Sequence, residues 1–248
     1  MIIVILPAYN EEEALPSLLR SLAEVQQKIL FDMVVIVIDD GSRDQTAKVV
    51  SHLADDYPWL SLVQHEQNQG LSRAIQTGFK LALEQAKSED VIVTLDADNT
   101  QPPDRIPLMI ERIEAGSDVV IASRFQSGAK VFGVSYLRRL YSFVMSVLFR
   151  VMVGLPGVRD YSCGFRAYRA SSLSRAYDRY GTRFITEEGF ACMVEILLKL
   201  GRMGSVRFSE VPFILHYEYK PTPTKMRVGS TIVDTLRLVL RYRFGSFG

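Results

Sequence analysis

The sequence predicts an α/β protein with a mostly parallel, doubly wound sheet and helices on both faces. Two patterns in the first half of the 248-residue chain support this class. Short apolar runs rich in β-branched residues alternate with longer segments whose apolar residues recur at helical spacing. Strands of parallel sheets are buried on both faces, and continuous apolar runs are typical of such strands.

The expected elements follow from these runs. Five apolar runs bounded by polar residues, glycine or proline are the expected strands: Ile2–Leu6, Met33–Ile38, Leu60–Val63, Val91–Leu95 and Val119–Ala122. The segments between them are the expected helices: Glu11–Lys28, Asp44–Asp55, Leu71–Lys87 and Asp104–Ala115. Ligands of such sheets bind beyond the carboxyl ends of the strands. That rule singles out four loops: Pro7–Asn10, Asp39–Ser42, Asp96–Gln101 and Ser123–Ser135.

The second half has a different pattern. Ser123–Ser135 contains two glycines and little periodicity, so we expect a mobile loop there. The later expected elements are a helix over Tyr136–Val153, a strand within Ser162–Tyr168, a helix over Glu187–Leu200, a strand pair or bent strand over Val206–Tyr217 and a last helix over Gly229–Tyr242. The simplest organisation is one domain with a C-terminal appendage.

Composition excludes several classes of protein. A net charge of +1 argues against a general nucleic-acid binder. Cys163 and Cys192 are too few for a disulfide scaffold and have no metal-site spacing, so we expect small buried residues in a reducing compartment. Met1 leads into a short apolar run without basic residues, so no signal peptide is expected. No apolar run reaches the roughly 20 residues that span a bilayer.

Charge is distributed unevenly along the chain. Residues 1–123 hold 20 acidic and 9 basic residues, whereas residues 124–248 hold 8 acidic and 20 basic residues. An acidic half next to a basic half suggests that one half holds a cation and the other meets an anion. Solvated surface charge in both halves is the alternative, and the asymmetry alone does not decide between them.

Asp96 and Asp98 follow the fourth expected strand. A turn at this point lets both carboxylates approach one ion. Mg²⁺ and Mn²⁺ prefer oxygen ligands and commonly take one or two protein carboxylates together with substrate phosphates. A metal here offsets charge on a leaving diphosphate. The alternative is a pair of solvated turn residues.

Two further strand ends carry groups suited to a nucleoside. Asp39 and Asp40 can accept hydrogen bonds from a base or ribose, and Gly41 permits close backbone approach. The alternative is a helix N-cap formed by Ser42 or Asp44. After the first strand, Tyr9 can pack on a nucleobase and Glu11 can bond a base or ribose, or Pro7 can start a turn with Asn10 as an N-cap.

These motifs resemble those of family 2 glycosyltransferases, which have the GT-A nucleotide-sugar-binding fold. The motifs occur in the family's order: Pro7-Ala8-Tyr9-Asn10-Glu11, Asp39–Thr46, Asn68-Gln69-Gly70 with Ala74 and Gly78, Asp96-Ala97-Asp98, and Ser123-Arg124-Phe125. Downstream, Asp160–Tyr168 and Glu210-Val211-Pro212 are similar to the dolichol- or polyprenol-phosphate mannose synthase branch. The resemblance covers nearly the whole chain.

The resemblance implies roles for individual residues. The donor-binding residues are Pro7, Ala8, Tyr9, Glu11, Asp39, Asp40, Gly70, Asp96, Ala97, Asp98 and Lys225. Asp96 and Asp98 bind the divalent metal, Mg²⁺ or Mn²⁺. Arg124, Arg138 and Ser142 bind the acceptor phosphate, for which guanidinium groups are well suited. The catalytic residues are Asp98, Arg124 and Asp160; Asp160 positions acceptor or sugar, or else pairs with Arg159 or Arg166.

The chain departs from the branch at two places. The branch often has Gln two residues after the second Asp, where this chain has Thr100 followed by Gln101, so a third side-chain metal ligand is left open. The branch also tends to carry an Arg after Glu-Val-Pro, where this chain has Glu218 with Lys220 nearby. Lys225 matches the branch and is expected to neutralise donor phosphates.

The implied function is an inverting transfer of a hexose, mannose from GDP-mannose, to a polyprenyl or dolichyl phosphate. The alternative is UDP-glucose or another UDP-sugar, with a lipid-phosphate or a sugar-hydroxyl acceptor; a hydroxyl acceptor needs a base, for which Glu187, Glu188 and Glu195 are the candidates. A silent sensor or scaffold is disfavoured by the intact Asp96 and Asp98. Residues 1–225 are then the catalytic domain, divided into a nucleotide-sugar half (1–123) and an acceptor half (124–225).

Two helices suggest a membrane surface as partner. The helix over 136–153 is apolar, interrupted by Ser142, Ser146 and Arg150. Its apolar part reaches only ~21 Å, too short to cross a bilayer, so an interfacial helix is expected, with a buried core helix as the alternative. Arg139 is expected to lie on a different face from Arg138 and Ser142. Residues 226–248 are expected to form a second amphipathic helix. We expect peripheral attachment at the cytoplasmic face, and a separate membrane-anchoring subunit stays open.

Overall fold

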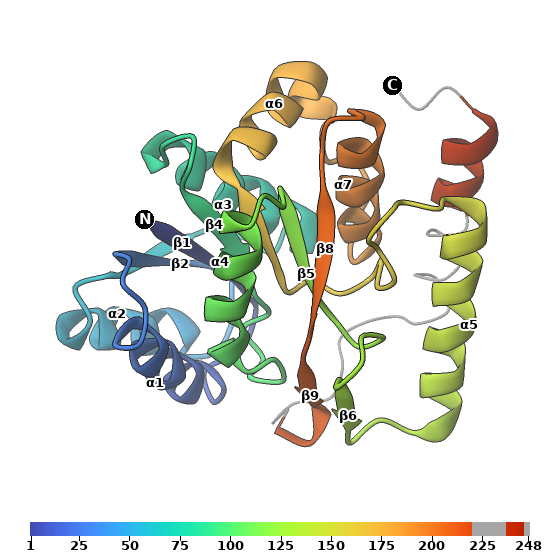
Figure 1. Ribbon diagram of the computed structural model, residues 1–248. Coiled ribbons are helices and arrows are strands. Elements are labelled where there is room, and N and C mark those ends of the chain that lie inside the picture. The colour runs from blue at the N-terminus through green and yellow to red at the C-terminus, as the bar shows by residue number, and fades with distance from the viewer. Residues whose placement is uncertain (220–236, 246–248) are drawn as a thin grey trace.

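A mostly parallel seven-stranded sheet forms the centre of the molecule, as predicted (Figure 1). The computed structural model describes residues 1–219 and 237–245, without the side chains of 137 and 138. The strands, in spatial order, are β3 (Leu60–Gln64), β2 (Met33–Asp39), β1 (Ile2–Ala8), β4 (Val91–Thr94), β7 (Arg166–Arg169), β5 (Val119–Ser123) and β8 (Phe208–Pro212). Only β7 runs antiparallel to its neighbours in this sheet.

Helices cover both faces of the sheet and explain why its strands are apolar on both sides. The helices near the sheet are α1 (Leu15–Gln26), α2 (Thr46–Asp56), α3 (Leu71–Gln85), α4 (Ile106–Glu114), α6 (Ala170–Tyr180) and α7 (Ala191–Arg202), with short 3₁₀ turns η1 (Pro103–Arg105), η2 (Gly181–Arg183) and η3 (Tyr217–Tyr219). α3 packs on β1 and β2, and α4 packs on β5 and β7. In Figure 1, α4 lies in front of the sheet and α3 behind it. Prolines near the first turns of α1 and α4 suit positions where no backbone donor is needed.

A second sheet, of two strands, was not expected from the sequence. β6 (Lys130–Phe132) pairs in parallel with β9 (Ile214–His216). The expected loop over Ser123–Ser135 therefore contains a short strand, and its mobility stays a prediction. β8 and β9 confirm two strands within Val206–Tyr217, although they belong to different sheets. The helix α6 was not anticipated.

α5 (Tyr136–Met152) confirms the apolar helix expected after the loop. Figure 1 shows it at the side of the molecule, away from β1 and β2, with the C-terminal helix next to its end. Residues 237–244 are helical. Leu238 packs with Val194 and Leu198 of α7. The expected helix from Gly229 otherwise lies outside the described residues, and the domain limits at 123, 225 and 226 stay predictions. Within the described part of the chain, no helix is both long and apolar enough to cross a membrane.

Candidate active site

The four loops singled out from the sequence follow strands that run in the same direction. β1, β2, β4 and β5 are parallel to one another, since β4 and β5 are each antiparallel to β7. Their carboxyl ends therefore lie at one edge of the sheet, where ligands of doubly wound sheets bind.

The loops after β1 and β2 are joined into one unit by hydrogen bonds. The Asn10 backbone N–H donates to Ser42 Oγ at 2.9 Å, and the Arg43 N–H donates to Asn10 Oδ1 at 2.8 Å. The Glu11 N–H donates to Thr46 Oγ1 at 2.9 Å. Asn10 has a φ of 53°, in the left-handed region that asparagine tolerates. Asn10 is thus not an N-cap as one alternative had it; its side chain holds the second loop.

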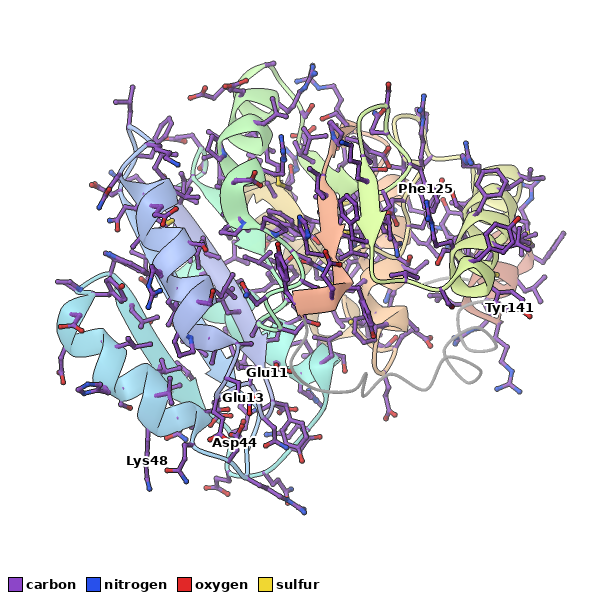
Figure 2. All side chains as sticks on the ribbon, turned by 90° about the horizontal axis from the view of Figure 1, so that it is seen from below. Glu11, Glu13, Asp44, Lys48, Phe125 and Tyr141 are labelled. Atoms are coloured by element: carbon purple, nitrogen blue, oxygen red, sulfur yellow. The ribbon has the colours of Figure 1, made fainter. Side chains whose placement is uncertain are left out.

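Asp44 shows why the second loop is ordered. Its Oδ1 accepts hydrogen bonds from the Thr46 N–H at 3.0 Å and Thr46 Oγ1 at 2.6 Å, at the start of α2. Burial disfavours its charge, but the hydrogen bonds from Thr46 and Glu12 prevail and lower the pKa of Asp44. In Figure 2, Glu11 and Asp44 occupy one region of the molecule, and Phe125 and Tyr141 lie on the other side of the view.

Asp39 and Asp40 are both buried and bonded within the protein. Asp39 accepts the Ser42 N–H and the Gln64 side-chain amide, each at 3.0 Å. Asp40 contacts a ring nitrogen of His65 at 2.7 Å and accepts the Gly70 N–H at 2.7 Å. Asp40 therefore shapes the loop between β3 and α3, and the predicted nucleoside contacts of both carboxylates stay predictions.

The two glycines of these loops have different environments. Gly41 has a φ of +68°, and a Cβ there would lie 2.4 Å from the carbonyl carbon of Gln67. The close backbone approach expected at Gly41 is thus to the protein's own chain. Gly70, with a φ of +89°, precedes α3 and has open space at its Cβ position.

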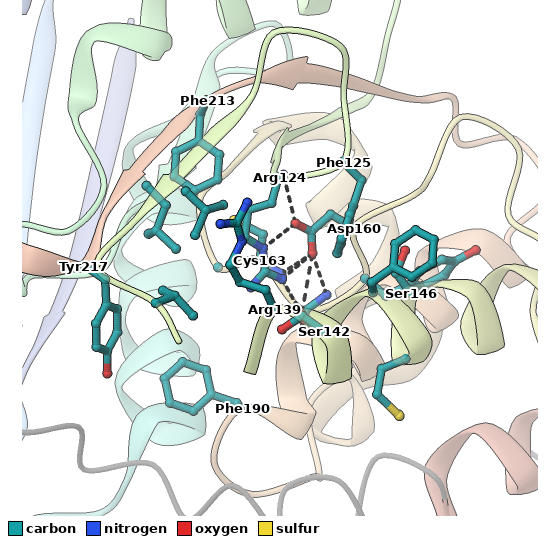
Figure 3. A pocket seen from close by; sticks show the side chains of 18 of the residues that line it. Arg124, Phe125, Arg139, Ser142, Ser146, Asp160, Cys163, Phe190, Phe213 and Tyr217 are labelled. Carbon is teal, nitrogen blue, oxygen red and sulfur yellow. Dashed lines mark hydrogen bonds and ion pairs between the residues drawn. The ribbon is translucent and has the colours of Figure 1, made fainter. Parts of the chain in front are cut away.

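A cavity of about 510 Å³ lies next to the loops after β4 and β5. Its polar wall contains Asp96, Asp98, Arg124, Arg139 and Asp160. Apolar side chains cover the rest, among them Val134, Phe143, Met145, Phe190, Phe213 and Leu215. Figure 3 shows Arg124 and Asp160 together in the polar part, with Phe190, Phe213 and Tyr217 around the remaining space. The cavity thus combines charged groups with an apolar wall.

The Asp96 and Asp98 carboxylates both line this cavity, as the expected turn requires. Asp98 Oδ1 accepts Thr100 Oγ1 at 2.7 Å, and Asn99 adopts a φ of 60°. The Gln101 amide donates to Asp96 Oδ2 at 2.6 Å. Gly164 leaves room here, since a Cβ would lie 3.1 Å from Asp96 Oδ1.

This donor set fits a hard cation that arrives with a diphosphate. Among the described residues, no group of three or more His, Cys, Asp and Glu could hold a metal. Mg²⁺, however, is usually bound through one or two carboxylates, substrate phosphates and water. Asp96 and Asp98 suffice for that mode of binding, while Thr100 and Gln101 hold the two carboxylates in place.

Arg124 and Asp160 form a two-point ion pair in the cavity wall. Arg124 Nε donates to Asp160 Oδ2 at 2.8 Å and Nη2 donates to Oδ1 at 2.7 Å. Nη2 also donates to Ser162 Oγ at 2.7 Å. Among the described residues Nη1 has no hydrogen-bond acceptor. Asp160 thus pairs with Arg124, and the alternative pairing with Arg159 or Arg166 is wrong.

Asp160 and Arg124 both favour their ionised forms, although the Asp160 carboxylate is fully buried. Burial disfavours the charge of Asp160, but Arg124 and its hydrogen bonds prevail and lower the pKa of Asp160. Burial likewise opposes the charge of Arg124, and Asp160 prevails to raise the pKa of the guanidinium. Both groups are therefore ionised at neutral pH.

The expected acceptor residues are placed only in part. Ser142 lines the cavity with Arg124. Arg139 lines it too, so the expectation that Arg139 lies on a different helix face from Ser142 is wrong. The position of Arg139 relative to the Arg138 side chain stays a prediction. Arg138 belongs to α5, but its side chain lies outside the described part, as does Lys225. The sequence shows that two arginines, Arg138 and Arg139, are adjacent at the start of the helix. It does not show how the helix is rotated, and the rotation decides which of them lines the cavity.

The candidate bases for a hydroxyl acceptor have other partners or lie at the surface. Glu187 forms an ion pair with Arg241, and Glu195 forms one with Lys199 at 2.7 Å. Glu188 is exposed. None of these three carboxylates is in the cavity wall described here.

α5 presents its apolar residues to solvent. Ser146 and Phe149 are buried, whereas five large side chains at helical spacing are exposed: Tyr136, Leu140, Val144, Val147 and Val151. This arrangement contradicts the alternative of a buried core helix. An apolar stripe on an outer face is typical of surfaces that bind a partner or a membrane.

Comparisons with known proteins identify relatives over most of the chain. The sequence model described as "Glycosyl transferase family 2" matches residues 3–176. The undecaprenyl-phosphate mannosyltransferase of Micrococcus luteus is 32% identical over 246 residues, covering 98% of this chain and 96% of that protein. The dolichol-phosphate mannosyltransferase of Pyrococcus furiosus is 34% identical over 241 residues, which are 96% of this chain but 62% of that protein. The chain thus spans less than two thirds of the Pyrococcus furiosus protein.

A third relative carries a different sugar in its name. The undecaprenyl-phosphate 4-deoxy-4-formamido-L-arabinose transferase of Pectobacterium atrosepticum is 31% identical over 245 residues, covering 95% of this chain and 72% of that protein. Among solved structures, glucosyl-3-phosphoglycerate synthase from Mycobacterium tuberculosis, in complex with Mn²⁺, uridine diphosphate and phosphoglyceric acid, superposes with a TM-score of 0.70. It is 19% identical and covers 99% of this chain and 79% of that one, which shows a shared GT-A-like fold.

Proposed function

The chain belongs to glycosyltransferase family 2, and on this premise we propose that it transfers mannose from GDP-mannose to a polyprenyl or dolichyl phosphate. The observation that carries the proposal is the cavity, in which Asp96, Asp98 and Arg124 share one space with an apolar wall. The carboxylates suit a metal-bound diphosphate, the guanidinium suits an acceptor phosphate, and the apolar wall suits the lipid next to it. The three relatives described above all have a polyprenyl-type phosphate in their names, whereas their sugars differ.

A phosphate acceptor explains why the cavity needs no base. A lipid phosphate is anionic near neutral pH, so one of its oxygens can attack the anomeric carbon directly. That carbon–oxygen bond forms as the bond to the donor diphosphate breaks, and a single in-line displacement inverts the anomeric configuration. Aligning two phosphates and stabilising the leaving group then account for catalysis.

The residues of the cavity divide this work between them. Asp96 and Asp98 would hold the divalent metal, which acts as a Lewis acid on the leaving diphosphate. Arg124, oriented by Asp160, and Arg139 would hold the acceptor phosphate. Ser142 lies in the same wall and can donate a hydroxyl hydrogen bond. Both oxygens of the Asp160 carboxylate accept hydrogen bonds from the Arg124 guanidinium. We therefore assign Asp160 the role of positioning Arg124, and not of acting on the substrate directly.

We propose that the protein attaches peripherally to the cytoplasmic face of a membrane, and the exposed face of α5 supports the attachment itself. Val144 is 53% exposed and Val151 is 80% exposed, and Leu240 and Phe244 of the C-terminal helix are exposed as well. Apolar helix faces of this kind insert at the boundary between lipid headgroups and chains. The same helix lines the cavity through Arg139, so binding at the interface would bring the cavity to the lipid phosphate.

A second candidate changes the sugar and keeps the acceptor. The relative named for 4-deoxy-4-formamido-L-arabinose transfer favours a sugar other than mannose. The donor of this second candidate is UDP-glucose or another UDP-sugar. A sugar-hydroxyl acceptor lacks such support, because the candidate bases Glu187, Glu188 and Glu195 lie outside the cavity wall.

A donor panel tests the proposal. Purified protein, Mn²⁺ or Mg²⁺ and a short polyprenyl phosphate are incubated with GDP-mannose, UDP-glucose or UDP-arabinose-type donors, and lipid-linked sugar is quantified by mass spectrometry. Mannosyl phosphoprenol is the expected product. Transfer from a UDP-sugar alone selects the second candidate, and absence of any lipid-linked sugar with all donors contradicts the proposal.

A further inference from the structure

Glu210 is a buried carboxyl group that lies behind the cavity without forming part of its wall. It stands on β8 in register with Ile121 of β5, the strand that leads to Arg124. The residue is 6% exposed. Its Oε1 accepts the backbone N–H of Arg159 at 2.6 Å and that of Asp160 at 2.7 Å. One oxygen therefore fixes two successive peptide groups.

These peptide groups begin the turn that aims Asp160 at Arg124. Asp160 Oδ1 also accepts the Cys163 N–H at 3.1 Å, and Oδ2 accepts the Arg124 N–H at 3.1 Å. The orientation of the Asp160 carboxylate thus depends on the backbone on both sides of it. A continuous chain of contacts leads from Glu210 through Asp160 to the guanidinium of Arg124.

We infer that Glu210 is a positioning residue of the acceptor site: its oxygen holds the peptide groups of Arg159 and Asp160, and through Asp160 it keeps Arg124 oriented toward the acceptor phosphate. The link to the acceptor rests on the proposed function, whereas the contacts themselves do not. The two backbone N–H groups need an acceptor oxygen at the position of Glu210 Oε1, but they do not need that oxygen to carry a negative charge. Burial raises the pKa of Glu210 against the opposing effect of its hydrogen bonds with Asp160 and Arg159, which agrees with a role as acceptor.

Two substitutions separate hydrogen bonding from charge. Glu210→Gln keeps an oxygen for both N–H groups, and the neighbouring Ser123 hydroxyl can accept from the new amide. Glu210→Ala removes the acceptor. Asp118→Ala is the matched control. Asp118 is also buried and comes directly before the first residue of β5, whereas Arg124 follows its last residue. Asp118 accepts hydrogen bonds from the Arg207 N–H at 2.9 Å and from Ser172 Oγ at 3.1 Å. This substitution also removes ion pairs with Arg169 and Arg207, so it is the harsher change, made at the end of β5 away from Arg124.

The first measurement is independent of any substrate. Hydrogen exchange of the Arg124 Nε–H is followed by ¹⁵N–¹H NMR, with the resonance assigned by its loss in Arg124→Lys. We expect slow exchange in the wild type, Glu210→Gln and Asp118→Ala, and fast exchange in Glu210→Ala. An Arg124 Nε–H that stays protected in Glu210→Ala overturns the inference.

The second measurement is the Michaelis constant for polyprenyl phosphate. Glu210→Ala should raise it about tenfold and leave the donor constant unchanged, whereas Glu210→Gln and Asp118→Ala should match the wild type. If Glu210→Gln raised the Michaelis constant for polyprenyl phosphate as much as Glu210→Ala does, the negative charge of Glu210 would be required, and the inference would be overturned. A wild type that transfers nothing to polyprenyl phosphate contradicts the proposed function alone, because the NMR result still decides the role of Glu210.

Discussion

The Arg124 guanidinium meets the Asp160 carboxylate at two points, 2.8 Å from Nε to Oδ2 and 2.7 Å from Nη2 to Oδ1. The residues are 36 positions apart in the chain. They come together because Arg124 follows β5 and Asp160 precedes β7, and these strands pair in antiparallel fashion. The end of one strand thus lies beside the beginning of the other, and the sheet itself builds the charged wall of the cavity.

The two buried carboxyl groups behind this wall should show opposite dependence on pH. Asp160 has a lowered pKa, so its contribution to stability is present above the ordinary value of 3.8 and is lost as pH falls through its native pKa. Asp160→Asn should lower the free energy of unfolding by about 3 kcal/mol at pH 7, a deficit that shrinks in acid. Glu210 has a raised pKa in the folded protein, so the unfolded state loses this proton more readily. The wild type therefore loses stability as the pH rises above the ordinary value of 4.5. Glu210→Gln should gain stability relative to wild type as pH rises from there.

Urea unfolding between pH 3 and pH 8 measures both differences. Curves for wild type and Asp160→Asn that stay parallel into acid would contradict the assigned ion pair. A Glu210→Gln difference that stays constant with pH would contradict the raised pKa of Glu210.

Asp98→Asn should abolish most turnover and leave the fold intact. The substituted amide oxygen can still accept the Thr100 hydrogen bonds that shape the turn, but a negative ligand of the metal is lost. We expect turnover to fall at least about a hundredfold, by analogy with the loss of one charge-stabilising group, and thermal stabilisation by Mn²⁺ to disappear. Asp104→Asn, whose side chain is 60% exposed in η1, is the control. An Asp98→Asn enzyme with wild-type turnover at limiting metal would refute the metal site.

Arg139→Ala should weaken the lipid phosphate and spare the donor. Its side chain lines the cavity beside Ser142, and a charge-assisted phosphate contact contributes about 1.5–3 kcal/mol, or roughly ten- to a hundredfold in efficiency. Arg139→Lys should rescue only in part, because an ammonium group lacks the planar fork. Arg150→Ala on the same helix lies outside the cavity wall and should resemble the wild type. Arg138→Ala, measured in the same assay, tests the prediction that Arg138 binds the acceptor phosphate. A donor constant that rises instead would place this arginine in the donor site.

Membrane binding should depend on the exposed face of α5. Val144→Asp with Val151→Asp should lower partition into anionic liposomes by about a hundredfold, since each buried valine contributes roughly 1.5 kcal/mol. The remaining binding should weaken with salt because nearby arginines attract anionic headgroups. Leu30→Asp, at a fully exposed leucine remote in sequence, is the control. Equal flotation of both variants would show that α5 does not contact lipid.

The first half of the fold could be predicted because its signals are local. Ile2–Leu6 and Met33–Ile38 are apolar at nearly every position, as strands covered on both faces must be. The strand ends then place Asp96 and Asp98 at the ligand edge by a general rule of such sheets. The turn that brings both carboxylates to one cavity follows from this placement.

The second half depends on contacts between distant segments. β6 has three residues and forms only because β9 pairs with it, so nothing in Lys130–Phe132 alone predicts a strand. α6 is rich in Ser, Arg and Tyr, and its buried face consists largely of small residues, namely Ala170, Ser172 and Ala176 beside Leu173 and Tyr180, so its apolar signal in the sequence is weak. The Arg124–Asp160 pair needs β7 between β4 and β5, an insertion that sequence periodicity does not reveal. The rotation of α5, and with it the position of Arg139, is likewise set by packing.

The measurement that tests the central claim most directly compares polyprenyl phosphate with the corresponding unphosphorylated polyprenol as acceptors. Both are presented in the same micelles with GDP-mannose and Mn²⁺, and lipid-linked mannose is quantified for the wild type and Arg139→Ala. If the cavity binds the lipid phosphate as the nucleophile, the wild type glycosylates only the phosphate, and Arg139→Ala requires about ten times more of it for the same rate. Comparable transfer to polyprenol, or transfer to polyprenol without transfer to the phosphate, would contradict the account.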